Sequence, residues 1–307
     1  MSAGSPRTYS CYGLVLRSDL DLPDLGAPLE TSDAPDVTIR FGPLEPPPAG
    51  TDPLPYGLWR TGDRCGVEVP DVGRYEARAG REVVIDPVPG ADPKAIRLFL
   101  LGSVMGAVMM QRDHLVLHGN AVRIGDACAV VVGHSGAGKS TLAAEFDRRG
   151  YDVLSDDVVP VDADGNALPG YPRIKLWDDA LERLGVGTDG LERINDDHEK
   201  FQLPLRRAEL APLPVRWIYV LERHTGTELT TEPVRGAATF GLLHEHTYRN
   251  ELVHGPDAVA RHLQQCARLV AGARVTRVQR PVETMTAGAT ADTILADTRI
   301  DLPQECA

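Results

Sequence analysis

The chain has 307 residues, of which 42% are hydrophobic and 25% are charged, and these proportions predict a globular protein with a sizeable core. Its formal net charge of −12 argues against nucleic acid and anionic membranes as partners, because either would need clustered lysine and arginine. The five cysteines show neither a zinc-ligand spacing nor a disulfide framework, so we expect reduced thiols and a cytoplasmic protein.

The N-terminal part of the chain, residues 8–90, is predicted to be mostly β. Short runs that favour strands alternate there with turn-rich segments such as the proline-rich loop at 43–50. We therefore expect a smaller β-rich N-terminal module over residues 1–92. Its strand candidates lie at 9–16, 36–41, 65–69 and 81–85.

An apolar helix is predicted next, from about Pro93 to Gln111. The stretch from Leu98 to Met110 carries no charge but is too short to span a bilayer, so we expect it to be buried. The boundary between the two parts of the chain is placed at this helix, and the catalytic domain is predicted to cover residues 93–307.

A phosphate-binding loop follows an apolar strand predicted at 127–132. Its nine residues fit the pattern GxxxxGK[ST] without mismatch, and a helical segment that ends on Gly150 comes next. In such a loop, backbone N–H groups cradle phosphate oxygens, the lysine reaches the β- and γ-phosphates, and the serine hydroxyl binds Mg²⁺. We thus predict that ATP and Mg²⁺ bind at Gly133, His134, Ser135, Gly136, Ala137, Gly138, Lys139, Ser140 and Thr141.

A pair of carboxylates, Asp156 and Asp157, follows a short apolar strand predicted at 152–154. Phosphoryl transfer needs carboxylates that hold Mg²⁺ and that orient or deprotonate the nucleophile. In a parallel sheet this pair and the P-loop would emerge at the same carboxyl edge, where ligands bind. One aspartate can face the metal and the other the acceptor hydroxyl; a polar turn or a helix cap is the alternative.

The rest of the chain is predicted to be mixed, with helical segments at 181–184 and 259–270 and a buried strand at 215–221. An HxH pattern in this part is a weak metal signal. The histidines concerned are His244, His246 and His254.

Three cations after the P-loop could neutralise phosphate charge, although a solvated side chain is the alternative for each. They are Lys175, Lys200 and Arg249. We select Lys200 as a nucleotide-binding residue, because it precedes Phe201 in an acidic segment.

The motifs around the P-loop resemble the catalytic domain of HPr serine kinase/phosphorylases. In that family an HG pair, here His118-Gly119, leads the strand before the loop. A helix ending in RG, here Arg149-Gly150, then precedes a strand ending in DD. The order and the approximate spacings agree over residues 114–162. The resemblance implies an α/β P-loop kinase core of the HPr kinase/PEP carboxykinase-like type, and also a homo-oligomer.

The resemblance implies roles for individual residues as well. Lys139 would bind phosphate, Ser140 would help to hold Mg²⁺, and His118 would lie beside the catalytic aspartate. Asp156 would be the general base and Asp157 the metal-side carboxylate, although which aspartate takes which role stays open at this point.

Two departures from the family bear on the acceptor. Thr141 stands where HPr kinases usually carry Glu, and Tyr151 stands where they usually carry His, so HPr itself is not the expected substrate. Short motifs resemble instead the HPr kinase-like proteins of bacterial biosynthetic clusters, including lasso-peptide kinases that phosphorylate a peptide's C-terminal serine. These motifs are Tyr12-Gly13-Leu14, Ser18-Asp19-Leu20 with Leu22-Pro23, Lys175-Leu176-Trp177, Glu199-Lys200-Phe201 and Arg280-Pro281.

The leading hypothesis is an ATP- and Mg²⁺-dependent kinase that phosphorylates a hydroxyl, expected to be a Ser or Thr of a peptide or small protein. Its catalytic residues would be His118, Lys139, Asp156 and Asp157. A small-molecule hydroxyl kinase is one alternative. A nucleotide-binding regulator or assembly factor is the alternative from another class, which the intact lysine, serine and aspartate pair disfavour.

Overall fold

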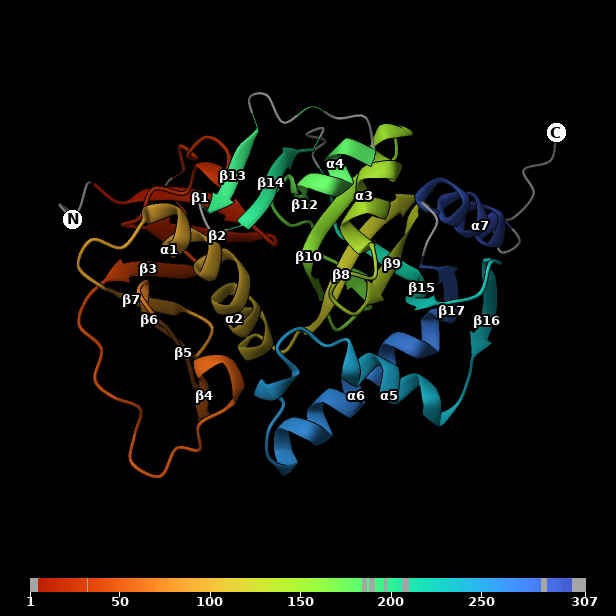
Figure 1. The fold of residues 1–307 in the computed structure, drawn as a ribbon. Coiled ribbons are helices and arrows are strands. Elements are labelled where there is room, and N and C mark those ends of the chain that lie inside the picture. The colour runs from red at the N-terminus through yellow and green to blue at the C-terminus, as the bar shows by residue number, and fades with distance from the viewer. Residues whose placement is uncertain are drawn as a thin grey trace.

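The structure of the protein is a computed structural model, which describes residues 5–31, 33–183, 187, 191–195, 198–205, 210–282 and 286–299. Within these residues, two seven-stranded sheets and one three-stranded sheet, with helices packed on them, form a mixed α/β fold (Figure 1). The predicted fold class, a nucleotide-binding α/β core beside a β-rich N-terminal part, is confirmed.

The first sheet is built from the N-terminal part of the chain, in the order β1-β2-β3-β7-β6-β5-β4. The single strand predicted at 9–16 is wrong, because Tyr12 and Gly13 adopt positive φ values of 54° and 73° and fold it into a hairpin. The strands are β1 (Arg7–Cys11), β2 (Leu14–Ser18), β3 (Val37–Phe41), β4 (Leu58–Thr61), β5 (Arg64–Val69), β6 (Gly73–Arg78) and β7 (Glu82–Pro87), with helical turns η1 (Pro23–Leu25) and η2 (Pro55–Gly57) between them.

The second sheet carries the P-loop and has the order β11-β10-β8-β9-β15-β17-β16. Strand β9 runs parallel to β15, and β15 runs parallel to β17, whereas β8 is antiparallel to both of its neighbours. The strands are β8 (Leu115–Ile124), β9 (Ala127–Gly133), β10 (Val153–Val161), β11 (Asn166–Ala167), β15 (Leu213–His224), β16 (Thr230–Val234) and β17 (Arg274–Pro281).

Helices cover both faces of this second sheet, as the unbroken apolar run of β9 requires. Ala129 and Val131 point to the face packed by α3 (Lys139–Arg148) and α7 (Ala287–Arg299). Val130 and Val132 point to the opposite face, packed by α5 (Ala237–Glu245) and α6 (Pro256–Gly272). The central strands are therefore buried on both sides, with helices packed on each face of the sheet (Figure 1).

One strand boundary differs from the prediction in a way that matters for the site. Strand β10 does not end near Leu154; it continues to Val161 because Val158, Val159 and Val161 are also buried and pair with β8. Asp156 and Asp157 thus lie inside the strand, opposite Asn120 and Gly119 of β8, rather than beyond its end.

The predicted apolar helix is confirmed as one helical segment, formed by α1 (Pro93–Phe99), the π-helical turn η3 (Leu100–Val104) and α2 (Met105–Gln111). By length and composition this segment could cross a membrane, but 61% of its apolar window is buried inside the protein, as in a core helix. Helix α2 contacts β6 of the first sheet and both β8 and β10 of the second. The segment thus joins the two sheets, and the domain boundary at residues 92–93 stays a prediction.

A small third sheet lies over the P-loop helix and has the order β12-β14-β13. Ile174 and Leu176 of β12 pack into the same core as α3, which fixes the strand beside β10. The elements are β12 (Arg173–Trp177), β13 (Glu192–Asn195) and β14 (His198–Pro204), with α4 (Asp178–Arg183) after β12 and the turn η4 (Asn250–Leu252) further along the chain.

Candidate active site

The P-loop has the predicted strand–loop–helix geometry. Gly136 and Gly138 have φ values of 79° and 96°, which side chains rarely adopt, and this lets the loop turn around the N-terminus of α3. A Cβ on Gly133 would lie 2.6 Å from the carbonyl oxygen of Leu221. These glycines are therefore required both by the backbone conformation and by the close packing of β9 on β15.

Lys139 lies at the centre of this loop. Its Nζ donates to the carbonyl oxygens of Gly133 at 2.6 Å and His134 at 3.2 Å, so the ammonium is held over the loop. Asn120 of β8 donates from Nδ2 to the carbonyl oxygen of Lys139 at 2.8 Å, which anchors the start of α3 to the sheet. The lysine is thus placed where a phosphate held by the loop would meet it.

A cavity of about 770 Å³, which we name the nucleotide cavity, opens above the P-loop. Its size lies within the range of small-molecule and cofactor sites. Besides the loop it is lined by side chains of the third sheet, of the ends of β15 and β17, and of the start of α7. They include Lys175, Leu176, Trp177, Ala180, Arg223, Arg280, Val282 and Ala287.

Asp156 is buried and joined to the P-loop. Ser140 Oγ donates to its two carboxylate oxygens at 3.1 and 3.2 Å, and the backbone N–H of Lys175 donates to Oδ2 at 3.2 Å. Burial, followed by the charge of Asp157, raises the pKa of Asp156 to about 6. A serine hydroxyl beside a carboxylate is the oxygen donor set that Mg²⁺ prefers next to nucleotide phosphates, so these two residues fit that ion.

Asp157 differs from its neighbour in surroundings and in backbone. Its φ of 74° is unusual for a residue with a side chain, and such strain is found at functional sites. Its Oδ2 accepts from Lys175 Nζ at 3.0 Å, and its Oδ1 lies 3.4 Å from His118 Nδ1. Burial lowers the pKa of His118, and this outweighs the opposing effect of Asp157, so the imidazole is neutral at pH 7.

A second cavity of about 610 Å³, which we name the acceptor-side cavity, lies on the other side of Asp157. One side of it is formed by Tyr56 of the N-terminal part and by Phe99 and Ser103 of the helical segment α1–η3. The other side is formed by the segment 245–251, which begins at the last residue of α5. The two cavities meet at five residues that line both. These are His118, Ser135, Asp157, Lys175 and Trp177.

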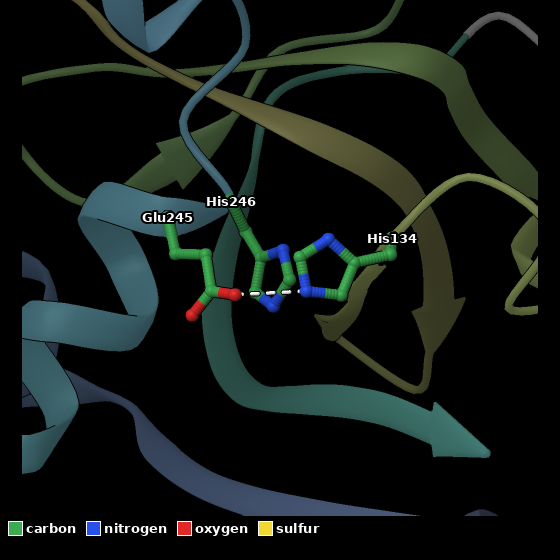
Figure 2. A group of neighbouring side chains, drawn as sticks. All are labelled: His134, Glu245 and His246. Carbon is green, nitrogen blue, oxygen red and sulfur yellow. Dashed lines mark ion pairs between the residues drawn. The ribbon is translucent and has the colours of Figure 1, made fainter.

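One wall of the acceptor-side cavity is a group of three side chains from the P-loop and the end of α5 (Figure 2). His134 Nε2 lies 2.8 Å from Glu245 Oε1, and the rings of His134 and His246 are 5.1 Å apart. Burial lowers the pKa of His246 to about 4. The three could offer ligand atoms to a metal ion, since these lie within 4.8 Å of one another.

The predicted HxH pattern does not form a site of its own. His246 faces the P-loop through His134, whereas His244 faces His262 of α6, with ring centroids 5.2 Å apart. The two histidines of the pattern therefore point to different neighbours. His254 does not belong to the metal-ligating group found among the described residues.

The structure brings together most of the predicted site residues: the P-loop, His118, Asp156 and Asp157. Thr141 lines the nucleotide cavity at the start of α3. The backbone of Lys200 pairs with Trp177 in the third sheet, but its side chain lies outside the described residues, so its role stays a prediction.

Lys175 lies in the site, although among the three candidate cations we selected Lys200 from the sequence. It is 8% exposed and lies in β12 between two core residues, Ile174 and Leu176. A lysine enclosed by apolar residues in a strand is rarely buried without a charged partner, and this pattern could have singled it out. Arg280 was noted only for its motif; its Nε donates to the carbonyl oxygen of Ala137 at 2.7 Å and supports the P-loop.

Comparisons with known proteins agree in part with the predicted resemblance. No family model matches the chain. Over 72 residues it is 35% identical to two HPr kinase/phosphorylases of Clostridium botulinum, strains Eklund 17B (type B) and Alaska E43 (type E3). This segment is 23% of the chain and spans 23% of the length of these curated relatives. Similarity to HPr kinase/phosphorylases is thus confirmed for a short segment, and similarity to lasso-peptide kinases stays a prediction.

The solved structures that match include the Hpr(Ser) kinase/phosphatase from Coxiella burnetii. Its sequence is 13% identical, and the superposition covers 60% of this chain and 90% of that chain with a TM-score of 0.24.

Proposed function

We propose that this protein is an ATP- and Mg²⁺-dependent kinase that transfers the γ-phosphoryl group of ATP to an acceptor hydroxyl. The observation that carries the proposal is the position of Asp157, which lines both the nucleotide cavity and the acceptor-side cavity. A carboxylate between a phosphate cradle and a second cavity is suited to accept a proton from a hydroxyl that attacks phosphorus.

Binding of the nucleotide is assigned to the P-loop. Backbone N–H groups of the loop would cradle the phosphates, and Lys139 would exchange its contacts with Gly133 and His134 for phosphate oxygens. Mg²⁺ would be held by Ser140 and Asp156, which already share hydrogen bonds. When bound, the ion would neutralise charge on the transferred phosphoryl group.

The geometry favours Asp157 as the base and Asp156 as the metal-side carboxylate, the reverse of the roles that the family resemblance implied. Asp156 is bonded to Ser140, while Asp157 reaches the acceptor-side cavity. In the reaction, the hydroxyl O–H bond breaks and its proton passes to Asp157. The oxygen bonds to the γ-phosphorus as the bond to the bridging oxygen of ADP breaks. Lys175 would hold the Asp157 carboxylate in position, and His118, whose Nδ1 lies 3.0 Å from the carbonyl oxygen of Asp157, would hold its backbone.

For the acceptor we propose a Ser or Thr hydroxyl of a peptide or small protein, as in the lasso-peptide kinases that the short motifs resemble. The volume of the acceptor-side cavity supports a side chain with its flanking backbone, and it would also admit a small molecule. A small-molecule hydroxyl kinase therefore stays the alternative.

The test is ATP consumption by the purified protein with Mg²⁺, measured with and without a panel of Ser/Thr peptides and small hydroxyl compounds. We expect stimulation by at least one class and a matching mass increase of one phosphate in the acceptor. Tight nucleotide binding with no transfer to any member of the panel would favour a nucleotide-binding regulator and contradict the proposal.

A further inference from the structure

Arg249 is a cation in the acceptor-side cavity that has no carboxylate in ion-pair contact in the part of the chain that the structure describes. It lines this cavity but not the nucleotide cavity. Among the residues that the structure describes, Arg249 forms no ion pair, and its side-chain hydrogen bond runs from Nε to Ser103 Oγ at 3.0 Å. Its two terminal amino groups are therefore available to a ligand.

The guanidinium of Arg249 is held in a fixed place. Its Cζ lies 5.4 Å from the ring centre of Tyr56 and 5.7 Å from that of Tyr248, so it is flanked by two aromatic rings. Its backbone has a positive φ of 49°, an unusual conformation for arginine. Tyr56 comes from the N-terminal part of the chain and Ser103 from the helical turn η3, so elements far apart in the sequence hold this side chain.

Other polar side chains of the cavity lie beside partners of their own. Lys175 pairs with Asp157, and His134 pairs with Glu245. Glu251 also lines the cavity; its Oε2 atom is buried and has no hydrogen-bond partner among the described residues. Of the described arginine and lysine side chains that line the cavity, Arg249 is therefore the one without a carboxylate in ion-pair contact.

Arg249 is close to the reacting groups. The ring of Tyr248 lies 5.5 Å from that of His118 on one side and contacts the Arg249 guanidinium on the other. The charge of Arg249 also contributes, after burial and nearer groups, to lowering the pKa of His118. Asp157 and Arg249 line the same cavity, so one small molecule or one end of a peptide can contact both.

We infer that the acceptor carries an anionic group, a carboxylate or a phosphate, which Arg249 binds while the acceptor hydroxyl lies at Asp157. The planar guanidinium offers paired N–H donors that match both groups. The inference rests on the proposed kinase function, which assigns this cavity to the acceptor. It goes beyond that function because it states the charge of the substrate.

A binding experiment tests the inference without any transfer reaction. The protein is loaded with Mg²⁺ and a non-hydrolysable ATP analogue, so that the phosphate cradle is filled, and is titrated with inorganic phosphate and, separately, with acetate. Nuclear magnetic resonance follows the arginine side-chain signals. We expect saturable shifts in the wild type that are lost in Arg249→Gln and retained in Arg216→Gln, a matched control at an exposed position of β15.

The titration that shifts these signals, with phosphate, with acetate or with both, identifies the anionic group that Arg249 binds. Equal binding by the wild type and Arg249→Gln in both arms, or no binding in either arm, overturns the inference. Thermal melting of each variant confirms that it is folded, and Arg249→Lys, which keeps the charge but not the paired donors, should bind with intermediate affinity.

A transfer experiment then separates this inference from the kinase proposal. Seryl peptides with a free carboxyl terminus are compared with their amidated forms, and hydroxy acids with neutral alcohols. We expect Arg249→Gln to lose about tenfold to a hundredfold in kcat/KM on the anionic members only. Transfer to neutral members as fast as to anionic ones would contradict the inference and leave the kinase proposal intact. Anion binding without any phosphoryl transfer would contradict the kinase proposal and leave the inference about Arg249 intact.

Discussion

The ammonium of Lys175 lies 3.0 Å from the carboxylate of Asp157, at the point where the two cavities of the protein meet. Lys175 comes from the third sheet, and Asp157 comes from the middle of β10 in the second sheet. The backbone N–H of the same lysine also donates to Asp156. A single strand residue thus holds both aspartates, and the arrangement depends on how β12 packs on β10.

Replacing Lys175 with methionine should remove most of the transfer activity. The substitution keeps the length of the side chain but removes the ammonium that lies 3.0 Å from the Asp157 carboxylate, and we expect kcat to fall by about 100-fold or more. Steady-state kinetics with any acceptor that is phosphorylated provide the measurement. Lys175→Arg serves as the control and should retain more activity than Lys175→Met; equal activity of the two variants would contradict a positioning role of this charge.

The burial of Asp156 should make stability depend on pH. Because its folded pKa is raised to about 6 from an ordinary 3.8, the folded state holds the proton more tightly than the unfolded state between these values. The free energy of unfolding should therefore fall as pH rises from about 4 to about 6 and stay low above that. Asp156→Asn removes the penalty, so in metal-free buffer at pH 7 it should be more stable than the wild type, on the order of 2 kcal/mol.

Urea unfolding at pH 4 and pH 7, with EDTA present, measures this effect. The difference in unfolding free energy between Asp156→Asn and the wild type should be larger at pH 7 than at pH 4. A difference that does not change with pH would show that the carboxyl group titrates as it does in water.

Gly119 should tolerate no side chain. It pairs with Asp157 across the sheet, and a Cβ at this position would lie 2.2 Å from the backbone carbonyl oxygen of Val131, which cannot move aside cheaply. We expect Gly119→Ala to cost at least about 2 kcal/mol of stability and to disturb Asp157. Thermal and urea unfolding give the cost.

Gly241 in α5 provides the matched control for that substitution. A Cβ there meets no atom within 4 Å, and the backbone is helical, so Gly241→Ala should be neutral or slightly stabilising. Similar losses for both variants would mean that the backbone of β9 yields more easily than the packing indicates.

The sequence predicted those parts of the fold and site that depend on local pattern. The P-loop is a contiguous motif between an apolar strand and a helix, and its glycines are read directly from their spacing. The buried helix at 93–111 followed from its lack of charge. The hairpin at Tyr12-Gly13 was missed because its apolar positions continue through the turn.

The roles of the two aspartates could not be read from the sequence, because they depend on contacts between distant segments. Asp156 faces Ser140 and Asp157 faces Lys175 only through the antiparallel pairing of β8 with β10 and the packing of β12. The acceptor-side cavity also requires Tyr56 from the N-terminal part and Ser103 from η3. Spacing along the chain carries no information on these contacts.

The most direct test of the account is the transfer activity of Asp157→Asn, measured in a single turnover with radiolabelled ATP, together with its nucleotide affinity. The substitution keeps the size of the side chain but removes the base. We predict that transfer falls by about 100-fold or more while the affinity for the Mg²⁺–nucleotide complex changes little. Asp156→Asn should instead weaken that affinity. Transfer at the wild-type rate by Asp157→Asn would contradict the account.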